Sequence, residues 1–76
     1  MIRPSLRAQQ LALHLEGVAR TWDACALTAP PQYPTWAADY RNYAAECRAR
    51  AALLRAGKPL PPWRHANAEA CMQEVS

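Results

Sequence analysis

The sequence has little of what a β-sheet, a membrane span or a disordered chain requires. Phenylalanine is absent, and six of the 76 residues are β-branched, which is too few for a sheet. No apolar run approaches the ~18 residues of a transmembrane helix, and no signal peptide with a basic start is recognisable. Hydrophobic residues make up 51% of the chain and charged residues 20%, a balance that excludes intrinsic disorder. We therefore expect one small folded domain, residues 1–76, in the cytoplasm, with no membrane association.

Large apolar side chains are also scarce. Of the 39 hydrophobic residues, 17 are alanine and three are cysteine, which leaves 19 large ones. A chain of this length buries roughly 60% of its unfolded surface. So small a core usually needs a covalent cross-link or a binding partner for stability. This shortage predicts association, and we expect a homodimer.

The residues that are abundant favour helices. Ala, Leu, Arg, Glu and Gln, all good helix formers, dominate the chain outside two proline-rich linkers at 29–34 and 57–62. Three helices are predicted between these breaks, at about 5–28, 35–56 and 63–75. The expected fold is all-α: a long antiparallel helical hairpin plus a shorter C-terminal helix.

The first helix carries two apolar stripes. Ser5 is its expected N-cap, and the main stripe steps by four and three residues, the spacing of a buried helix face. A second, thinner stripe on the far side contains Leu6, Leu13 and Leu27. A helix in a small monomer rarely needs two apolar faces, so this second stripe predicts a surface for self-association or for a partner. The main stripe comprises Leu11, Leu15, Val18, Trp22 and Cys25.

The second helix separates an aromatic face from an alanine face. Thr35 is its expected N-cap, and Gly57 is the expected residue just past its end. The alanine face would let another helix approach closely. The predicted core face comprises Trp36, Tyr40, Tyr43, Cys47, Ala51 and Leu54; the opposite face comprises Ala38, Ala45, Ala49, Ala52 and Ala56.

Arginines repeat along the second helix. Arg41, Arg48 and Arg55 are seven residues apart, so they form one ridge with about 10.5 Å between neighbours. We call these three residues the arginine ridge. The ridge suits contact with an acidic protein surface and, less readily, with the phosphates of a nucleic acid. The alternative is that the aliphatic parts of these arginines cover the seam between the helices and their charged groups are only solvated. Arg50 lies on another flank and is expected to pair with Glu46, four residues earlier.

Chemistry-bearing residues form no recognisable catalytic or metal-binding pattern. The three cysteines are 22 and 24 residues apart, which matches no close-spaced framework. Cys47 and Cys71 are expected at one level of an antiparallel helix pair, as two buried thiols or, less readily, a disulfide. We expect no enzymatic activity, no metal ion and no cofactor.

The linkers contain two short proline patterns. The segment 30–33 reads as a PPxY ligand, and 59–64 reads as PxxP followed by a basic residue. Each pattern lies where one helix stops and the next begins. Both are therefore better explained as rigid connectors, each with an aromatic residue that latches the next helix.

These features together predict a small non-enzymatic protein-binding module, an adaptor, inhibitor or regulator. Its size suits a protein that a phage or mobile element encodes to block a host protein. The expected contacts are the arginine ridge for an acidic partner surface, and Leu6, Leu13 and Leu27 for self-association or a partner. One alternative is a nucleic-acid-binding regulator that uses the same ridge, and a weaker one is a redox or metal sensor built on cysteine.

Overall fold

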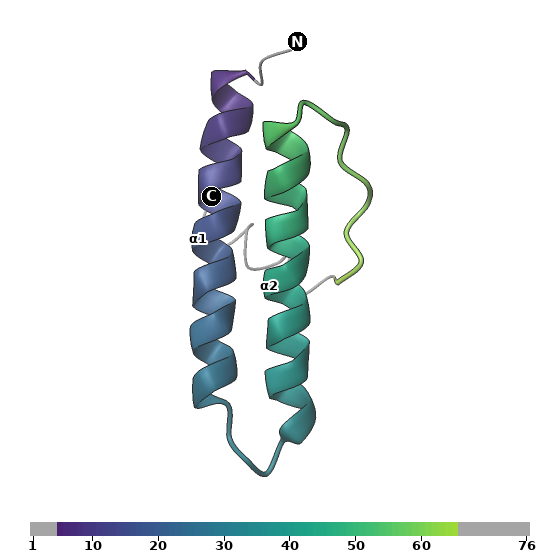
Figure 1. Ribbon diagram of the computed structural model, residues 1–76. Helices are drawn as coiled ribbons and strands as arrows, with labels where there is room; N and C mark the ends of the chain where they lie inside the picture. The colour runs from purple at the N-terminus through teal and green to yellow at the C-terminus, as the bar shows by residue number, and fades with distance from the viewer. Residues whose placement is uncertain (1–4, 66–76) are drawn as a thin grey trace.

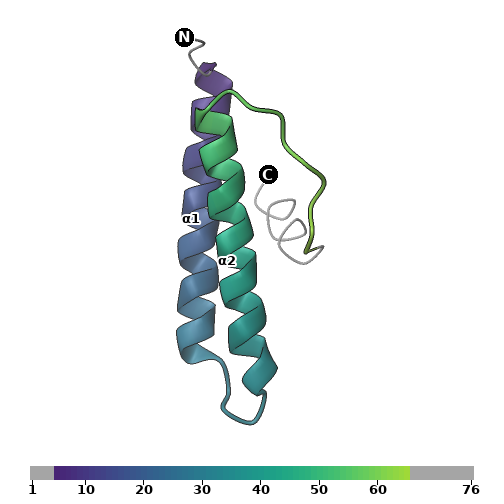
Figure 2. The ribbon, with the colours of Figure 1, turned by 45° about the vertical axis from the view of Figure 1, so that its right-hand side comes forward.

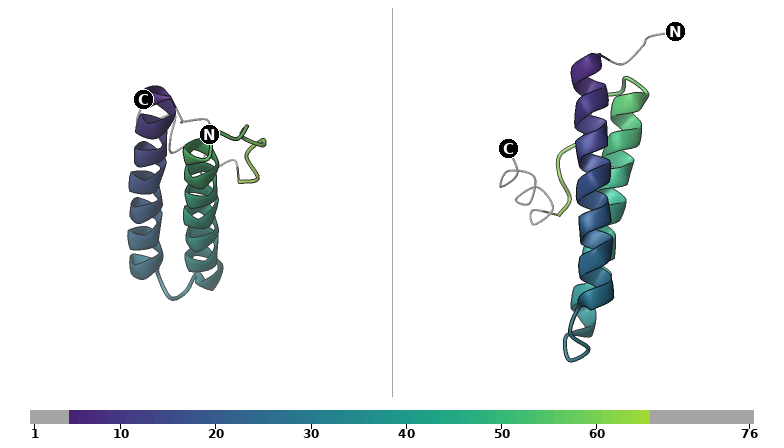
Figure 3. Two further views of the ribbon diagram at one scale, coloured as in Figure 1. Left: turned by 45° about the horizontal axis from the view of Figure 1, so that its top comes forward. Right: turned by 90° about the vertical axis from the view of Figure 1, so that its left-hand side faces the viewer.

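The computed structural model describes residues 5–65, which form two antiparallel helices and an extended return segment (Figure 1). Helix α1 spans Leu6–Thr28 and helix α2 spans Pro34–Arg55. After α2 the chain runs back alongside this helix without regular structure as far as residue 65 (Figure 2; Figure 3). The predicted all-helical hairpin is confirmed, and residues 5–65 contain no strand.

Helix α1 begins and ends close to the predicted positions because its capping groups are in place. The Ser5 hydroxyl accepts a hydrogen bond from the Ala8 N–H at 3.1 Å, which confirms Ser5 as the N-cap. At the other end Ala29 is extended and Pro30 follows, so the helix cannot continue. The Thr28 hydroxyl lies 3.1 Å from the Ala24 carbonyl and 3.4 Å from the Cys25 carbonyl, and the Cys25 carbonyl is one of the last four, which lack a partner N–H within the helix.

Helix α2 begins one residue earlier than predicted. Tyr33 is the N-cap residue and makes no side-chain cap, while Pro34 takes the first turn, where its fixed φ suits a helix start. Thr35 is therefore not the N-cap. At the far end Gly57 adopts φ 70°, its N–H donates to the Leu54 carbonyl at 3.1 Å, and Lys58 N–H donates to the Leu53 carbonyl at 2.9 Å. This pair of bonds is a Schellman motif and confirms the predicted role of Gly57.

The core between the helices is built from small side chains. Leu15 and Cys47 are the largest fully buried residues, and several alanines fill the rest of the interface. The smooth contact surfaces let the two helices pack closely, so a short chain with little bulk forms a defined hairpin. The buried cluster comprises Ala12, Leu15, Val18, Ala19, Ala44, Cys47 and Ala51, with Leu11, Trp22, Tyr43, Leu54 and Trp63 packed against it.

Aromatic rings extend this core toward the hairpin turn. The Trp22 ring stacks on Tyr40 at 5.4 Å and meets Tyr43 edge-on at 4.9 Å between centroids. Trp36 was expected in the core but is 41% exposed and stacks on Tyr33 at 4.2 Å. The reason is its position in the first turn of α2, at the end of the hairpin, where the linker supplies the ring that it contacts.

The predicted third helix is wrong at its start. Residues 63–65 are not helical, and the rest of the predicted range, 66–75, lies outside the described residues. The proposed pairing of Cys47 with Cys71 lies outside them as well. No helix in residues 5–65 is long and apolar enough to cross a membrane.

Candidate functional site

The arginine ridge lies along the seam between the helices, and α1 supplies carboxylates to two of its three members. Arg55 Nη2 lies 2.6 Å from Glu16 Oε1, and Arg48 pairs with Asp23. The two carboxylates are seven residues apart, like the two arginines, so antiparallel packing brings both pairs into register. Arg41 is exposed and makes no hydrogen bond or ion pair within residues 5–65.

Each of these two ion pairs lowers the pKa of its carboxylate. The Arg55 hydrogen bond lowers the pKa of Glu16, and the Arg48 hydrogen bond lowers the pKa of Asp23. Arg41 adds a smaller attraction that lowers the pKa of Asp23 further. All four paired side chains remain 37–50% exposed, so each pair contributes little to stability.

The second apolar stripe of α1 lies on the surface, as the sequence predicts. Leu6 is 70% exposed, Leu13 61% and Leu27 84%. We call these three residues the leucine face. They lie at seven- and fourteen-residue intervals on the side of α1 that does not pack against α2, and Arg20, also exposed, completes the seven-residue series. The leucine face is therefore a row of exposed apolar side chains on one side of α1, with one arginine between Leu13 and Leu27.

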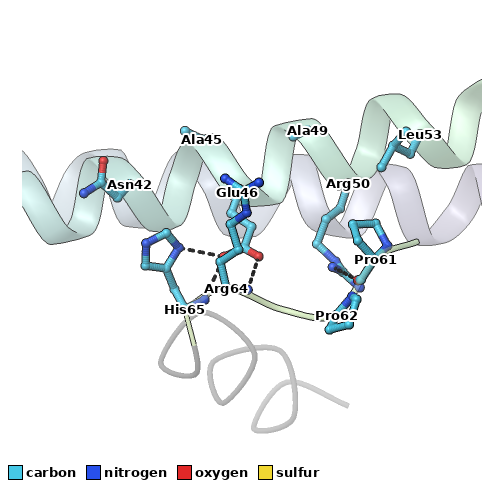
Figure 4. A pocket seen from close by; sticks show the side chains of 10 residues that line it. All are labelled: Asn42, Ala45, Glu46, Ala49, Arg50, Leu53, Pro61, Pro62, Arg64 and His65. Atoms are coloured by element: carbon cyan, nitrogen blue, oxygen red, sulfur yellow. Dashed lines mark hydrogen bonds and ion pairs between the residues drawn. The ribbon is translucent and has the colours of Figure 1, made fainter. Parts of the chain in front are cut away.

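A groove of about 420 Å³ lies between α2 and the return segment (Figure 4). The exposed alanines of α2 form its floor, and the prolines of the second linker form its opposite wall. The sequence predicted the alanine face but not this covering, because nothing in the local pattern places residues 61–65 beside it. The lining residues are Asn42, Ala45, Glu46, Ala49, Arg50, Leu53, Pro61, Pro62, Arg64 and His65.

Glu46 holds the end of the return segment. One carboxylate oxygen accepts a hydrogen bond from the Arg64 N–H at 2.6 Å. The other lies 3.0 Å from the His65 N–H and 2.7 Å from His65 Nδ1. Desolvation raises the pKa of Glu46, but these hydrogen bonds together outweigh it and lower the pKa. These hydrogen bonds therefore favour the ionised form of the carboxylate.

Arg50 contacts the return segment too, so the predicted Arg50–Glu46 pair is wrong. The Arg50 side chain is bound from two sides: Nη1 donates to the Pro61 carbonyl at 2.6 Å, and the Trp63 ring covers the guanidinium at 4.0 Å. The residue is 7% exposed, and its Nε has no hydrogen-bond partner among the residues that the structure describes. Arg50 and Glu46 both contact the return segment, at residues 11 to 19 positions further along the chain. Helical spacing alone could not indicate these contacts.

The first linker is a turn rather than a polyproline helix. Tyr33 N–H donates to the Pro30 carbonyl at 3.0 Å, which closes a four-residue turn, and Tyr33 stacks on Trp36. A PPxY ligand is read in the extended polyproline conformation. The geometry therefore favours the reading of this linker as a connector with an aromatic latch.

The cysteines and other metal-ligand side chains do not converge in the described region. Cys47 is buried and Cys25 half-buried. Among residues 5–65, no three His, Cys, Asp or Glu side chains lie close enough to hold a metal ion.

Comparisons with models of protein families, with curated proteins and with solved structures find no match to this chain.

Proposed function

We propose that this chain is a non-enzymatic protein-binding module that docks through the leucine face of α1. The supporting observation is the exposure of Leu6, Leu13 and Leu27 on one side of a helix whose other side already forms the core. Water around three leucines in line is released when a partner covers them, and this gain drives association. The proposed partner is a protein with an apolar groove or helix face, either a second copy of this chain or a different protein.

The arginine ridge contributes to this surface less than its sequence suggests. Glu16 and Asp23 neutralise Arg55 and Arg48, so Arg41 is the ridge cation best placed to attract an acidic group on the partner. The same pairing weakens the alternative of a nucleic-acid-binding regulator, since a phosphate track needs several uncompensated cations. The leucine face, in contrast, has no competing partner in the described part of the chain.

A matched pair of baits tests the proposal. One bait is the wild-type chain, and the other carries Leu6→Gln, Leu13→Gln and Leu27→Gln, exposed positions where glutamine keeps helix propensity. Circular dichroism should show equal helix content for both. We expect a protein from the native cell, identified by mass spectrometry, to bind the wild type and to be lost from the triple variant.

Three further measurements test the proposal. Light scattering shows whether the bound protein is a second copy of this chain, which is the homodimer that we propose as the resting form. If every captured protein binds the triple variant as strongly as the wild type, the leucine face is not the docking surface. Reversal of Arg41 alone should weaken binding only where the partner surface is acidic.

A further inference from the structure

The groove beside α2 contains a buried positive charge that forms no ion pair with a carboxylate of residues 5–65. Arg50 is 7% exposed and has no ion-pair partner within residues 5–65. A guanidinium removed from water normally gains a carboxylate or several hydrogen bonds in exchange. Here it gains one carbonyl, that of Pro61, and the face of the Trp63 ring.

These two contacts leave one edge of the guanidinium unused. Nη1 is bound to the carbonyl, and the Trp63 ring lies over the flat face of the group. The Nε–H is buried and has no acceptor, and no hydrogen bond of Nη2 occurs among the described residues. Nε and Nη2 point the same way, and this edge binds a carboxylate through two parallel N–H···O bonds.

The surroundings of this edge match an apolar acid. The groove has a volume of about 420 Å³, within the range of small-molecule sites. Ala45, Ala49 and Leu53 line it along α2, and Pro62 lines it from the return segment (Figure 4). The one acidic lining residue, Glu46, already accepts three hydrogen bonds from Arg64 and His65, so its charge is engaged.

We propose that this groove binds a small organic carboxylate, whose acid group bonds to the free edge of Arg50 and whose apolar body lies on the alanines of α2. The exposed Arg64 at the same groove adds positive potential and attracts the anion. Because Nε is buried, the ligand enters by displacing the exposed side chain of Pro62, while the Pro61 carbonyl keeps its bond to Nη1. The carboxylate is that of a free acid or of an acidic side chain on a bound protein.

The test titrates the full chain with hexanoate and follows the arginine Nε–H signals by NMR. We expect the Arg50 Nε–H signal to move downfield and to saturate, because a carboxylate then accepts its proton. Hexanamide, which is the same size and neutral, should leave the signal in place. Acetate, which lacks the apolar body, should bind at least about tenfold more weakly, since four methylene groups no longer contact the alanines.

Variants separate the groove from the arginine ridge. Arg50→Lys keeps the charge but not the planar fork, so it should weaken hexanoate binding about tenfold. Because this variant has no Arg50 Nε–H, its titration is followed on the backbone amide of Ala49, which lines the groove. Arg41→Lys, the matched control, should leave binding unchanged. A blocked Leu-Glu-Leu peptide that binds more tightly than hexanoate assigns the acid to a protein partner, and weaker binding assigns it to a free acid. An Arg50 signal that does not respond to hexanoate, or that responds equally to hexanamide, overturns the proposal whether or not the variants fold. The triple glutamine variant of the leucine face should leave this titration unchanged. The groove proposal and the leucine-face proposal can therefore fail independently of each other.

Discussion

Leu13 and Leu15 offer a direct test of which side of α1 the protein uses. The two leucines are separated by one residue, yet Leu15 is 1% exposed and Leu13 is 61% exposed. Truncation of each to alanine removes the same atoms from the same helix. Any difference in stability between the two variants therefore reports burial and not helix propensity, which changes equally in both.

The expected loss for Leu15→Ala is large for so small a protein. Removal of a fully buried leucine costs about 2–5 kcal/mol, and the neighbouring alanines have no side-chain length with which to refill the space. The total unfolding free energy of a chain of this length is about 4–11 kcal/mol. A loss near 3 kcal/mol lowers the melting temperature by about 12–24 °C.

Leu13→Ala should cost less than about 0.5 kcal/mol in dilute solution, as exposed substitutions generally do. Thermal unfolding of both variants by circular dichroism, repeated over a wide range of protein concentration, measures these values. If a second copy covers the leucine face, the Leu13→Ala deficit grows with concentration, because mass action stabilises only the wild type. Equal, concentration-independent losses for the two variants would refute the assignment of the faces.

Three other perturbations test the polar contacts. Arg48→Asp should lower the melting temperature by placing an acid beside Asp23, and adding Asp23→Arg to the same chain should restore most of the loss. If the double variant shows no recovery, the Arg48–Asp23 pair does not form in solution. Glu46→Gln should speed hydrogen exchange at the Arg64 and His65 amides, measured by NMR against unchanged exchange in α1, and equal exchange would show that the carboxylate does not hold the segment. Acidification should destabilise the hairpin, because the paired carboxylates have folded pKa values below their ordinary ones. Their contribution to stability is complete above the ordinary pKa values, near pH 4 to 4.5, and is lost as the pH falls through the folded pKa values. The melting temperature at about pH 3 should therefore be lower than at pH 6.

Local sequence signals determined the hairpin itself. Ser5 and Gly57 have one chemical role each at a helix end, so the two boundaries that depend on them were predictable. The leucine face followed from spacing alone, because a helix in a small monomer buries one apolar stripe and leaves a second stripe on its far side exposed. Thr35 misled the prediction because proline at the first helical position competes with a capping side chain one residue later.

Only the tertiary structure decided what the charged residues do. Helical spacing paired Arg50 with Glu46, but both side chains reach the return segment, where Pro61, Trp63 and His65 provide a carbonyl, a ring and N–H donors. Spacing likewise placed the arginine ridge on the surface without showing that Glu16 and Asp23 of α1 face two of its members across the seam. A periodic pattern specifies which side of one helix a residue occupies, whereas the groove and the ion pairs depend on chain segments brought together from 11 to 39 positions apart.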